Sequence, residues 1–189
     1  MAALLSPASA AGAEWKAVER IETYAIAGKT GLALYESIGE RGPLIRGKVR
    51  TVAYTDFKLT WTRDYQARDG VCTLASATPK LIITYRLPKP SAKLPADTAR
   101  RWATFISGLQ EHEKVHGDFI KEMVAGIEAQ TVGLSVENDP HCRKIRTEMT
   151  KRLSALSQAQ RKKSADFDRV EMSDGGNIHQ LILALVNGG

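Results

Sequence analysis

The spacing of apolar residues changes near Pro95, and this change sets the fold class. Before Pro95, short runs rich in β-branched and aromatic residues are separated by glycine, proline and polar residues, which is typical of strands and turns. After Pro95, apolar residues recur every three or four positions, as on one face of a helix. We therefore predict an α+β fold with an N-terminal antiparallel sheet and long C-terminal helices.

The N-terminal half should form one sheet with a single short helix. The alternating residues 19–27 predict a first strand, and Thr30 can cap a helix over residues 31–38. Further strands are expected over residues 48–54, 57–65, 71–75 and 80–87. The run Pro88-Lys89-Pro90 should end the last strand and begin a linker to the helical half.

The C-terminal half predicts two long helices and a short apolar segment. The first helix should span residues 97–129, and a loop containing Gly133 and Pro140 should follow it. A second helix should begin near Ile145 and extend to about Phe167. After a glycine-rich turn, residues 181–186 must be buried as either a helix or a strand.

The composition describes one globular domain, which we place at residues 14–189. The chain has 189 residues, of which 43% are hydrophobic and 25% are charged. No apolar run reaches the ~18 residues that span a bilayer. The net charge of +6 raises the question of nucleic acid, but the basic residues of 143–163 are interleaved with acids on a predicted helix, without a nucleic-acid-binding motif. We expect a monomer with no nucleic-acid partner.

The N-terminal segment and the two cysteines point to the periplasm or to secretion. Residues 1–13 are uncharged and rich in Ala, Ser and Leu, and Ala8-Ser9-Ala10 has the small-x-small form of a signal-peptidase site. We interpret this segment as the remnant of an export signal; the alternative is a disordered N-terminus. An even cysteine count in an exported protein suggests one disulfide between Cys72 and Cys142, the alternative being two buried free thiols.

The residues that carry chemistry lie on the first long helix, in the run His112-Glu113-Lys114-Val115-His116. His112 and His116 are one helical turn apart, so both imidazoles face the same way and can bind one Zn²⁺ ion. Glu113 lies beside them, where it can act as general base toward a zinc-activated water. This is the HExxH arrangement of zinc peptidases. The alternative, two histidines hydrogen-bonded within the core, would bury two polar rings at a cost that a metal removes.

A catalytic zinc needs a third protein ligand, which the residues themselves leave open. The candidates by chemistry are His141, Asp168, Glu171, Asp174 and His179. His141 adjoins Cys142 and should face elsewhere. If the two helices are antiparallel and meet near residues 130–140, residues 168–174 overshoot His116 by roughly 20 Å, unless the loop shifts the second helix back.

Several segments of the chain resemble a bacterial family of predicted secreted zinc-dependent proteases, an HExxH-containing domain of unknown function. The segments that carry the resemblance are Tyr24-Ala25-Ile26-Ala27-Gly28-Lys29-Thr30, Leu34-Tyr35, Phe57-Lys58-Leu59-Thr60-Trp61, Cys72, Trp102, Leu109, His112 to Asp118, Cys142 and Phe167-Asp168-Arg169. The resemblance implies export, a Cys72–Cys142 bridge and peptidase activity. It also suggests a third ligand, because many members resemble Tyr-Asp-x-x-Thr-x-His-Gly near the C-terminus, where the His is the natural choice.

This chain departs from that pattern at the histidine. It reads from Phe167-Asp168 to Asp174-Gly175, so with one inserted residue Asp174 stands where the histidine would be. We therefore select Asp174 as the third zinc ligand, with Glu171, His179 and Asp168 as alternatives.

These patterns predict a secreted or periplasmic zinc metallopeptidase that hydrolyses a peptide or protein substrate. One of the strands between residues 48 and 87 would present its edge to the peptide. The alternative function is a catalytically inactive zincin-like binding or scaffolding protein of the cell envelope. A closed site with four protein ligands would favour that alternative, whereas an open coordination position favours the enzyme.

Overall fold

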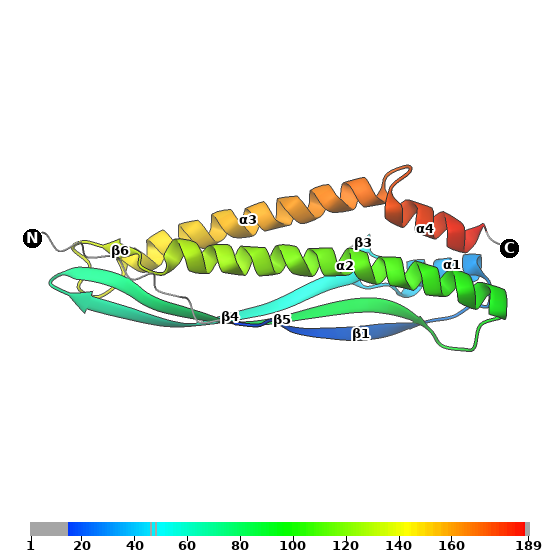
Figure 1. The fold of residues 1–189 in the computed structure, drawn as a ribbon, viewed down its shortest axis with the longest axis horizontal. Coiled ribbons are helices and arrows are strands. Elements are labelled where there is room, and N and C mark those ends of the chain that lie inside the picture. The colour runs from blue at the N-terminus through cyan, green and yellow to red at the C-terminus, as the bar shows by residue number, and fades with distance from the viewer. Residues whose placement is uncertain (1–14, 46, 48, 188–189) are drawn as a thin grey trace, which may run out of the picture.

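A long β-hairpin forms the base of the computed structural model, which describes residues 15–45, 47 and 49–187 (Figure 1). Its strands are β4 (Tyr54–Arg68) and β5 (Val71–Pro90), which pair in antiparallel fashion. Asp69 and Gly70 connect them with φ angles of 49° and 79°. Positive φ at both positions is what a two-residue type I′ turn requires, and this turn matches the twist of the strands.

The first strand, β1 (Val18–Ile26), lies on the other side of β5 and runs parallel to it, with Val18 opposite Ile82. The two-residue strand β6 (Ser135–Val136) pairs antiparallel with the start of β5. The predicted antiparallel pairing is thus confirmed for β4 and β5, whereas β1 departs from it and β6 lies where a loop was predicted. Alternation of apolar and polar residues marks a strand but not its direction, so the sequence did not distinguish the two pairings.

A short helical excursion connects β1 to the hairpin. It consists of α1 (Gly31–Arg41), β2 (Leu44–Ile45) and β3 (Val49–Arg50), of which β2 and β3 pair with each other. The predicted cap of α1 is confirmed, since Thr30 Oγ1 accepts a hydrogen bond from the Ala33 amide at 3.2 Å. The predicted strand over residues 48–54 is replaced by β3 and the first residue of β4.

The predicted strands over residues 71–75 and 80–87 form one continuous strand, β5, which also extends beyond residue 87 because its C-terminal prolines remain in the sheet. Pro88 lies opposite Tyr24 of β1, and Pro90 lies opposite Ile26. β4 ends its pairing at Arg86, so past that residue β5 has β1 alone as a neighbour. The Ser91 amide donates to the Ile26 carbonyl at 2.9 Å, so it points toward β1. N–H directions alternate along a strand, so Pro88 and Pro90 lack their N–H on the side of β5 that has no partner strand among the described residues, where no ladder bond is lost.

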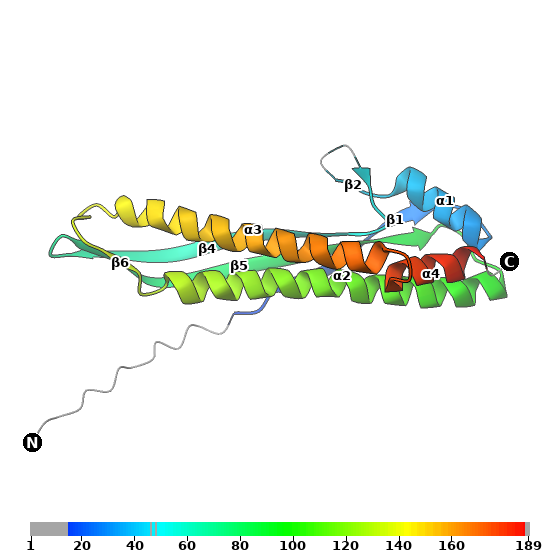
Figure 2. The ribbon, with the colours of Figure 1, turned by 90° about the horizontal axis from the view of Figure 1, so that it is seen from above.

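Three helices cover one face of the sheet: α2 (Ala96–Thr131), α3 (Lys144–Met172) and α4 (Asn177–Val186). Figures 1 and 2 show α2 lying along β5, with α3 antiparallel beside α2 and rising away from the sheet toward its C-terminal end. Both predicted long helices are confirmed, although α3 extends beyond residue 167. The final apolar segment is a helix.

The core lies between α2 and the sheet. Toward one end, Phe105 and Leu109 of α2 pack with Leu34 of α1 and with α4. In the middle, Ile120 and Val124 of α2 pack on β5. The site described below lies between these two clusters, on the face of α2 that α3 and β4 share.

The predicted disulfide is present and fixes the far end of the molecule. Cys72 of β5 and Cys142, just before α3, have Cα atoms 5.3 Å apart and are bonded through their sulfurs. Both cysteines are buried, in a cluster with Leu74, Ile145 and Met149.

Within the described residues, no helix combines the length and the apolarity that a membrane crossing requires. The segment 1–13, interpreted from its sequence as the remnant of an export signal, lies outside the described residues.

Candidate metal centre

The HExxH residues lie on the buried face of α2, where the helix passes between α3 and β4. His112 and Glu113 are each 4% exposed, and His116 is 9% exposed. α2 is continuous through this region, so the four-residue spacing puts both imidazoles on one side, as predicted. Such burial of three polar side chains requires partners.

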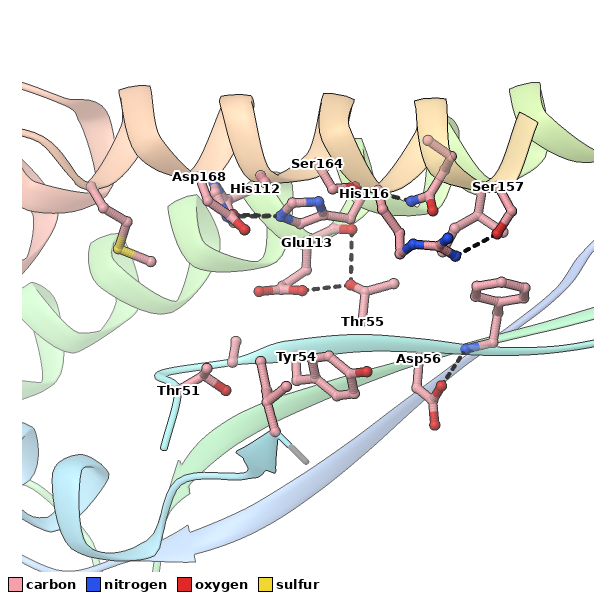
Figure 3. Close-up of a pocket in the computed structure, with 18 residues that line it drawn as sticks. Thr51, Tyr54, Thr55, Asp56, His112, Glu113, His116, Ser157, Ser164 and Asp168 are labelled. Atoms are coloured by element: carbon pink, nitrogen blue, oxygen red, sulfur yellow. Dashed lines mark hydrogen bonds and ion pairs between the residues drawn. The ribbon is translucent and has the colours of Figure 1, made fainter. Parts of the chain in front are cut away.

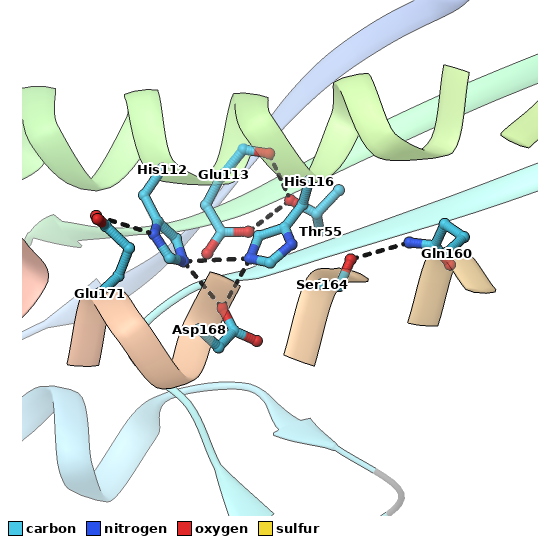
Figure 4. A network of polar contacts seen from close by, with 8 residues as sticks. All are labelled: Thr55, His112, Glu113, His116, Gln160, Ser164, Asp168 and Glu171. Carbon is cyan, nitrogen blue, oxygen red and sulfur yellow. Dashed lines mark hydrogen bonds and ion pairs between the residues drawn. The ribbon is translucent and has the colours of Figure 1, made fainter. Parts of the chain in front are cut away.

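One carboxylate from α3 completes the group (Figure 4). Asp168 Oδ1 lies 3.1 Å from His112 Nε2 and 2.8 Å from His116 Nε2. The two Nε2 atoms are 3.2 Å from each other. Each of the three residues thus offers one ligand atom to the same point, and together they form a group able to hold a metal ion.

The size of this triangle fits a tetrahedral zinc ion. Zinc binds imidazole nitrogen and carboxylate oxygen at about 2.0–2.1 Å, so two ligand atoms of a tetrahedron lie about 3.3 Å apart. The measured edges of 2.8, 3.1 and 3.2 Å are close to that value. Hydrogen bonds alone explain the arrangement less well, because two facing imidazole nitrogens need a proton between them while both also face Asp168.

The position of α3 explains why Asp168 reaches the histidines. The loop over residues 132–143 includes β6 and carries the chain past the end of α2, so α3 begins farther out along the molecule (Figure 2). This shift removes the overshoot expected from a tight connection between the helices. Residue 168 then lies level with the HExxH residues.

The structure places Asp174, the ligand selected from the sequence, away from the histidines. It lies in the turn after α3, its side chain is fully exposed, and its nearest partner is His179 Nε2 at 4.0 Å. This selection from the sequence therefore does not fit the geometry, because α3 ends at Met172 and the chain turns outward before residue 174. His179 accepts from the Gly175 amide, and His141 is exposed beside the disulfide.

Glu171, another alternative, contacts the opposite side of the His112 ring. Its Oε2 lies 3.7 Å from His112 Nδ1, the nitrogen that points away from Asp168 (Figure 4). His112 Nδ1 is buried and has no hydrogen-bond partner within the described part of the chain. Glu171 is therefore placed to favour the tautomer with a proton on Nδ1, which leaves Nε2 free for a metal. Glu171 lies on the far side of the ring from Asp168, so it is not part of the group that could hold a metal ion.

Glu113 is held at the open side of the group by a threonine from the sheet. Thr55 Oγ1 lies 2.5 Å from Glu113 Oε2 and 3.2 Å from the Glu113 carbonyl oxygen, so its hydroxyl can donate to either. Burial raises the pKa of Glu113, against the opposing effects of the Thr55 hydrogen bond and of the histidines. A carboxylate with a raised pKa is a better proton acceptor, as a general base requires.

The charges around Asp168 stabilise its ionised form. Burial alone would raise the pKa of Asp168, but the hydrogen bonds and charges of His112 and His116 outweigh it and lower the pKa. For His116, burial lowers the pKa, yet the hydrogen bond and charge of Asp168, with the charge of Glu113, raise it overall. The aspartate is thus an anion that can bind a cation.

A pocket of about 490 Å³ opens beside these residues, between α3 and β4 (Figure 3). It is lined by residues 54–57 of β4, by His112, Glu113 and His116, and by one face of α3. β4 pairs with β5 on one side only among the described strands, so its other edge is free. The site is therefore accessible to an extended ligand.

The comparisons with known proteins identify a family. The model of a bacterial protein family of unknown function, DUF922, matches residues 21–176. The chain belongs to DUF922. No curated protein and no solved structure gives a significant match. The description of DUF922 assigns no activity, so the site alone must support any function.

Three residues of this DUF922 chain have roles at the site that the sequence did not reveal. Thr55 comes from a strand that no spacing rule connects to Glu113. Phe167 stacks on the His112 ring with centroids 4.7 Å apart and contacts His116 by its edge. Glu171 was considered only as a direct ligand. The one signal in the sequence for these roles was Phe167, the aromatic residue next to Asp168. An aromatic ring beside an acid can shield a buried polar group.

Proposed function

We propose that this protein is a zinc-dependent peptidase. The observation that carries the proposal is the convergence of His112 Nε2, His116 Nε2 and Asp168 Oδ1 beside a buried glutamate, at the wall of an open pocket. Three protein ligands with an open position are typical of catalytic zinc, whereas structural zinc has four.

The bound zinc would supply Lewis-acid chemistry, lowering the pKa of a water toward about 7 and polarising a carbonyl. The residues of the chain would move the proton. Glu113, with its pKa raised by burial, would accept the proton of the attacking water and deliver it to the leaving nitrogen of the cleaved peptide. Thr55 would keep the Glu113 carboxylate turned toward the pocket, through its hydrogen bond to Oε2.

The free edge of β4 would hold the substrate. An extended peptide can add to an exposed edge by backbone hydrogen bonds, and residues 54–57 of that strand line the pocket beside Glu113. The substrate would therefore be a peptide or an unfolded segment of a protein, since an extended backbone is needed.

The proposed setting is the periplasm or the extracellular space, with the protein acting as a monomer. The disulfide between Cys72 and Cys142 supports this location, because such bonds persist in oxidising compartments. The proposed substrates would then be peptides or proteins of that compartment.

The decisive experiment measures zinc and hydrolysis in the wild type and in Glu113→Gln. We expect one zinc per chain, hydrolysis of peptides that a chelator abolishes, and recovery on adding zinc. Glu113→Gln should retain the metal, because it is not a ligand, and lose about 10²–10⁴-fold in activity, because general-base catalysis is worth that much.

Two outcomes would contradict the proposal. Full activity in Glu113→Gln would remove Glu113 as the base. Stoichiometric zinc in a wild-type protein that cleaves no member of a peptide library would favour the zincin-like binding or scaffolding function instead.

A further inference from the structure

Resting on the proposed function, the geometry points to a carboxylate-binding subsite at Arg161. The cleft would select peptides that carry an acidic group three or four residues from the scissile bond. Of the described residues that line the pocket, Arg161 alone is a lysine or an arginine. Its neighbours in the same wall, Ser157 and Ser164, are uncharged. The subsite thus consists of one positive charge among pocket-lining residues of α3 that are polar but uncharged.

The guanidinium of Arg161 is oriented without being neutralised. Its Nη1 donates to Ser157 Oγ at 2.6 Å, one turn earlier on α3 (Figure 3). The ion pairs found among residues 15–45, 47 and 49–187 do not include Arg161. The next two residues differ, since Lys162 pairs with Asp166 and Lys163 with Glu122. Arg161 therefore keeps N–H donors free, in a fork that suits a carboxylate.

The spacing along α3 sets the distance from the reacting bond. Arg161 precedes Asp168 by seven residues, which is roughly 10 Å at 1.5 Å per residue. The hydrogen bond to Ser157 draws the guanidinium slightly farther from Asp168. An extended peptide advances about 3.3 Å per residue, so a distance of roughly 10–13 Å corresponds to three or four residues.

The two ends of the pocket differ, which gives the peptide a preferred direction. On the other side of Asp168 along α3 lies Met172, which lines the pocket with Ile45 and Ala53. Among the described residues that line the pocket, no lysine or arginine lies on that side of Asp168. An acidic residue of the substrate is thus favoured on the Arg161 side of the cleaved bond and not on the other.

Asp56 supplies the competing charge. It lines the same pocket from β4, and its Oδ1 accepts from the Phe57 amide at 2.8 Å. If Asp56 dominated, the cleft would instead prefer lysine or arginine. Arg161 and Asp56 therefore predict opposite substrate preferences, and the experiment distinguishes between them.

The experiment profiles the zinc-loaded full chain on a proteome-derived peptide library, with new termini identified by mass spectrometry. We expect Asp or Glu to be enriched at the third or fourth position on one side of the cleaved bond. Arg161→Gln should abolish this enrichment and lower kcat/KM for an acidic peptide about tenfold, because one charge-assisted hydrogen bond is lost. The same peptide with Asn or Gln at that position should be cleaved equally by both proteins.

The matched control is Lys162→Gln, which removes a charge from the same turn but lies outside the pocket. It should retain the preference. Paired peptides with free and amidated C-termini separate a side-chain carboxylate from a terminal one.

Cleavage without acidic preference, or a preference that survives Arg161→Gln, would overturn the subsite while leaving the peptidase intact. A basic preference that Asp56→Asn removes would reassign the subsite to Asp56. Failure of the zinc-loaded wild type to cleave any peptide would overturn the proposed function and the subsite with it.

Discussion

At the scale of single residues, the geometry favours Asp168 over Asp174 as the third ligand of the proposed zinc. Asp168 Oδ1 lies within 3.1 Å of both Nε2 atoms, whereas Asp174 is exposed in the turn after α3. We predict that Asp168→Ala lowers the zinc affinity by more than about 100-fold, because loss of a direct ligand should exceed the 10–100-fold typical of outer partners. Competition with a chromogenic chelator measures this affinity. Asp174→Ala is the matched control and should bind zinc as the wild type does; the reverse ranking would remove Asp168 from the site.

If the site binds zinc as proposed, Glu171 would act on the metal through His112. Its carboxylate is 3.7 Å from a buried Nδ1 that lacks another partner, just beyond hydrogen-bond distance. We predict that Glu171→Leu lowers the zinc affinity about tenfold, because the ring loses the group that fixes its tautomer. Glu171→Gln keeps an oxygen acceptor and should lose less. Nitrogen chemical shifts of His112 would report the tautomer, and an unchanged tautomer with unchanged affinity in Glu171→Leu would show that Glu171 has no such role.

At the scale of elements, the predictable part of the site is the part that one helix contains. His112, Glu113 and His116 needed only helical periodicity, which the sequence displays directly. Asp168 depends on how α3 is aligned with α2, and this alignment is set by how far the loop over residues 132–143 extends. Thr55 depends on the placement of β4 beneath α2. Neither the alignment of α3 with α2 nor the placement of β4 can be predicted from sequence spacing, because both result from packing between elements.

The close approach of α2 to β5 is possible because residue 117 is glycine. A Cβ at Gly117 would collide with the hydroxyl of Tyr85, whose ring lies against the helix next to His116. Tyr85 also donates to Glu19 of β1 at 2.7 Å, so it connects the helix, the central strand and the edge strand.

We predict that Gly117→Ala lowers the free energy of unfolding by about 1–3 kcal/mol, the usual cost of overpacking a core. Zinc affinity should fall with it, because α2 must shift beside His116. Adding Tyr85→Phe removes the atom that would collide most closely and leaves ring carbons at 3.1 and 3.2 Å, so the double variant should recover part of the loss. Urea denaturation of the single and double variants measures this coupling. Additive losses in the double variant would contradict the proposed contact.

At the scale of the whole molecule, the site and the disulfide lie at different positions along one elongated structure. The candidate metal site, with Glu113 and Thr55, joins α2, α3 and the edge of β4, and the disulfide links β5 to the start of α3. Asp168 follows Lys144 by 24 residues, which is roughly 36 Å along α3. Near the site, α3 is held instead by its packing on α2 and by Phe167 against the two histidines.

Because of this separation, we predict that the disulfide stabilises the fold but does not determine the positions of the residues at the site. The bond closes a loop with a sequence separation of 70. In the chain-entropy model its loss raises the entropy of the unfolded chain, so Cys72→Ala with Cys142→Ala should lower the free energy of unfolding by about 4 kcal/mol. Zinc affinity, measured well below the unfolding temperature, should stay within about twofold of the wild type, because the contacts of Asp168 are local. A large loss of affinity in a variant whose circular dichroism remains native would instead mean that the distant bond holds α3 in the alignment that brings Asp168 to the histidines.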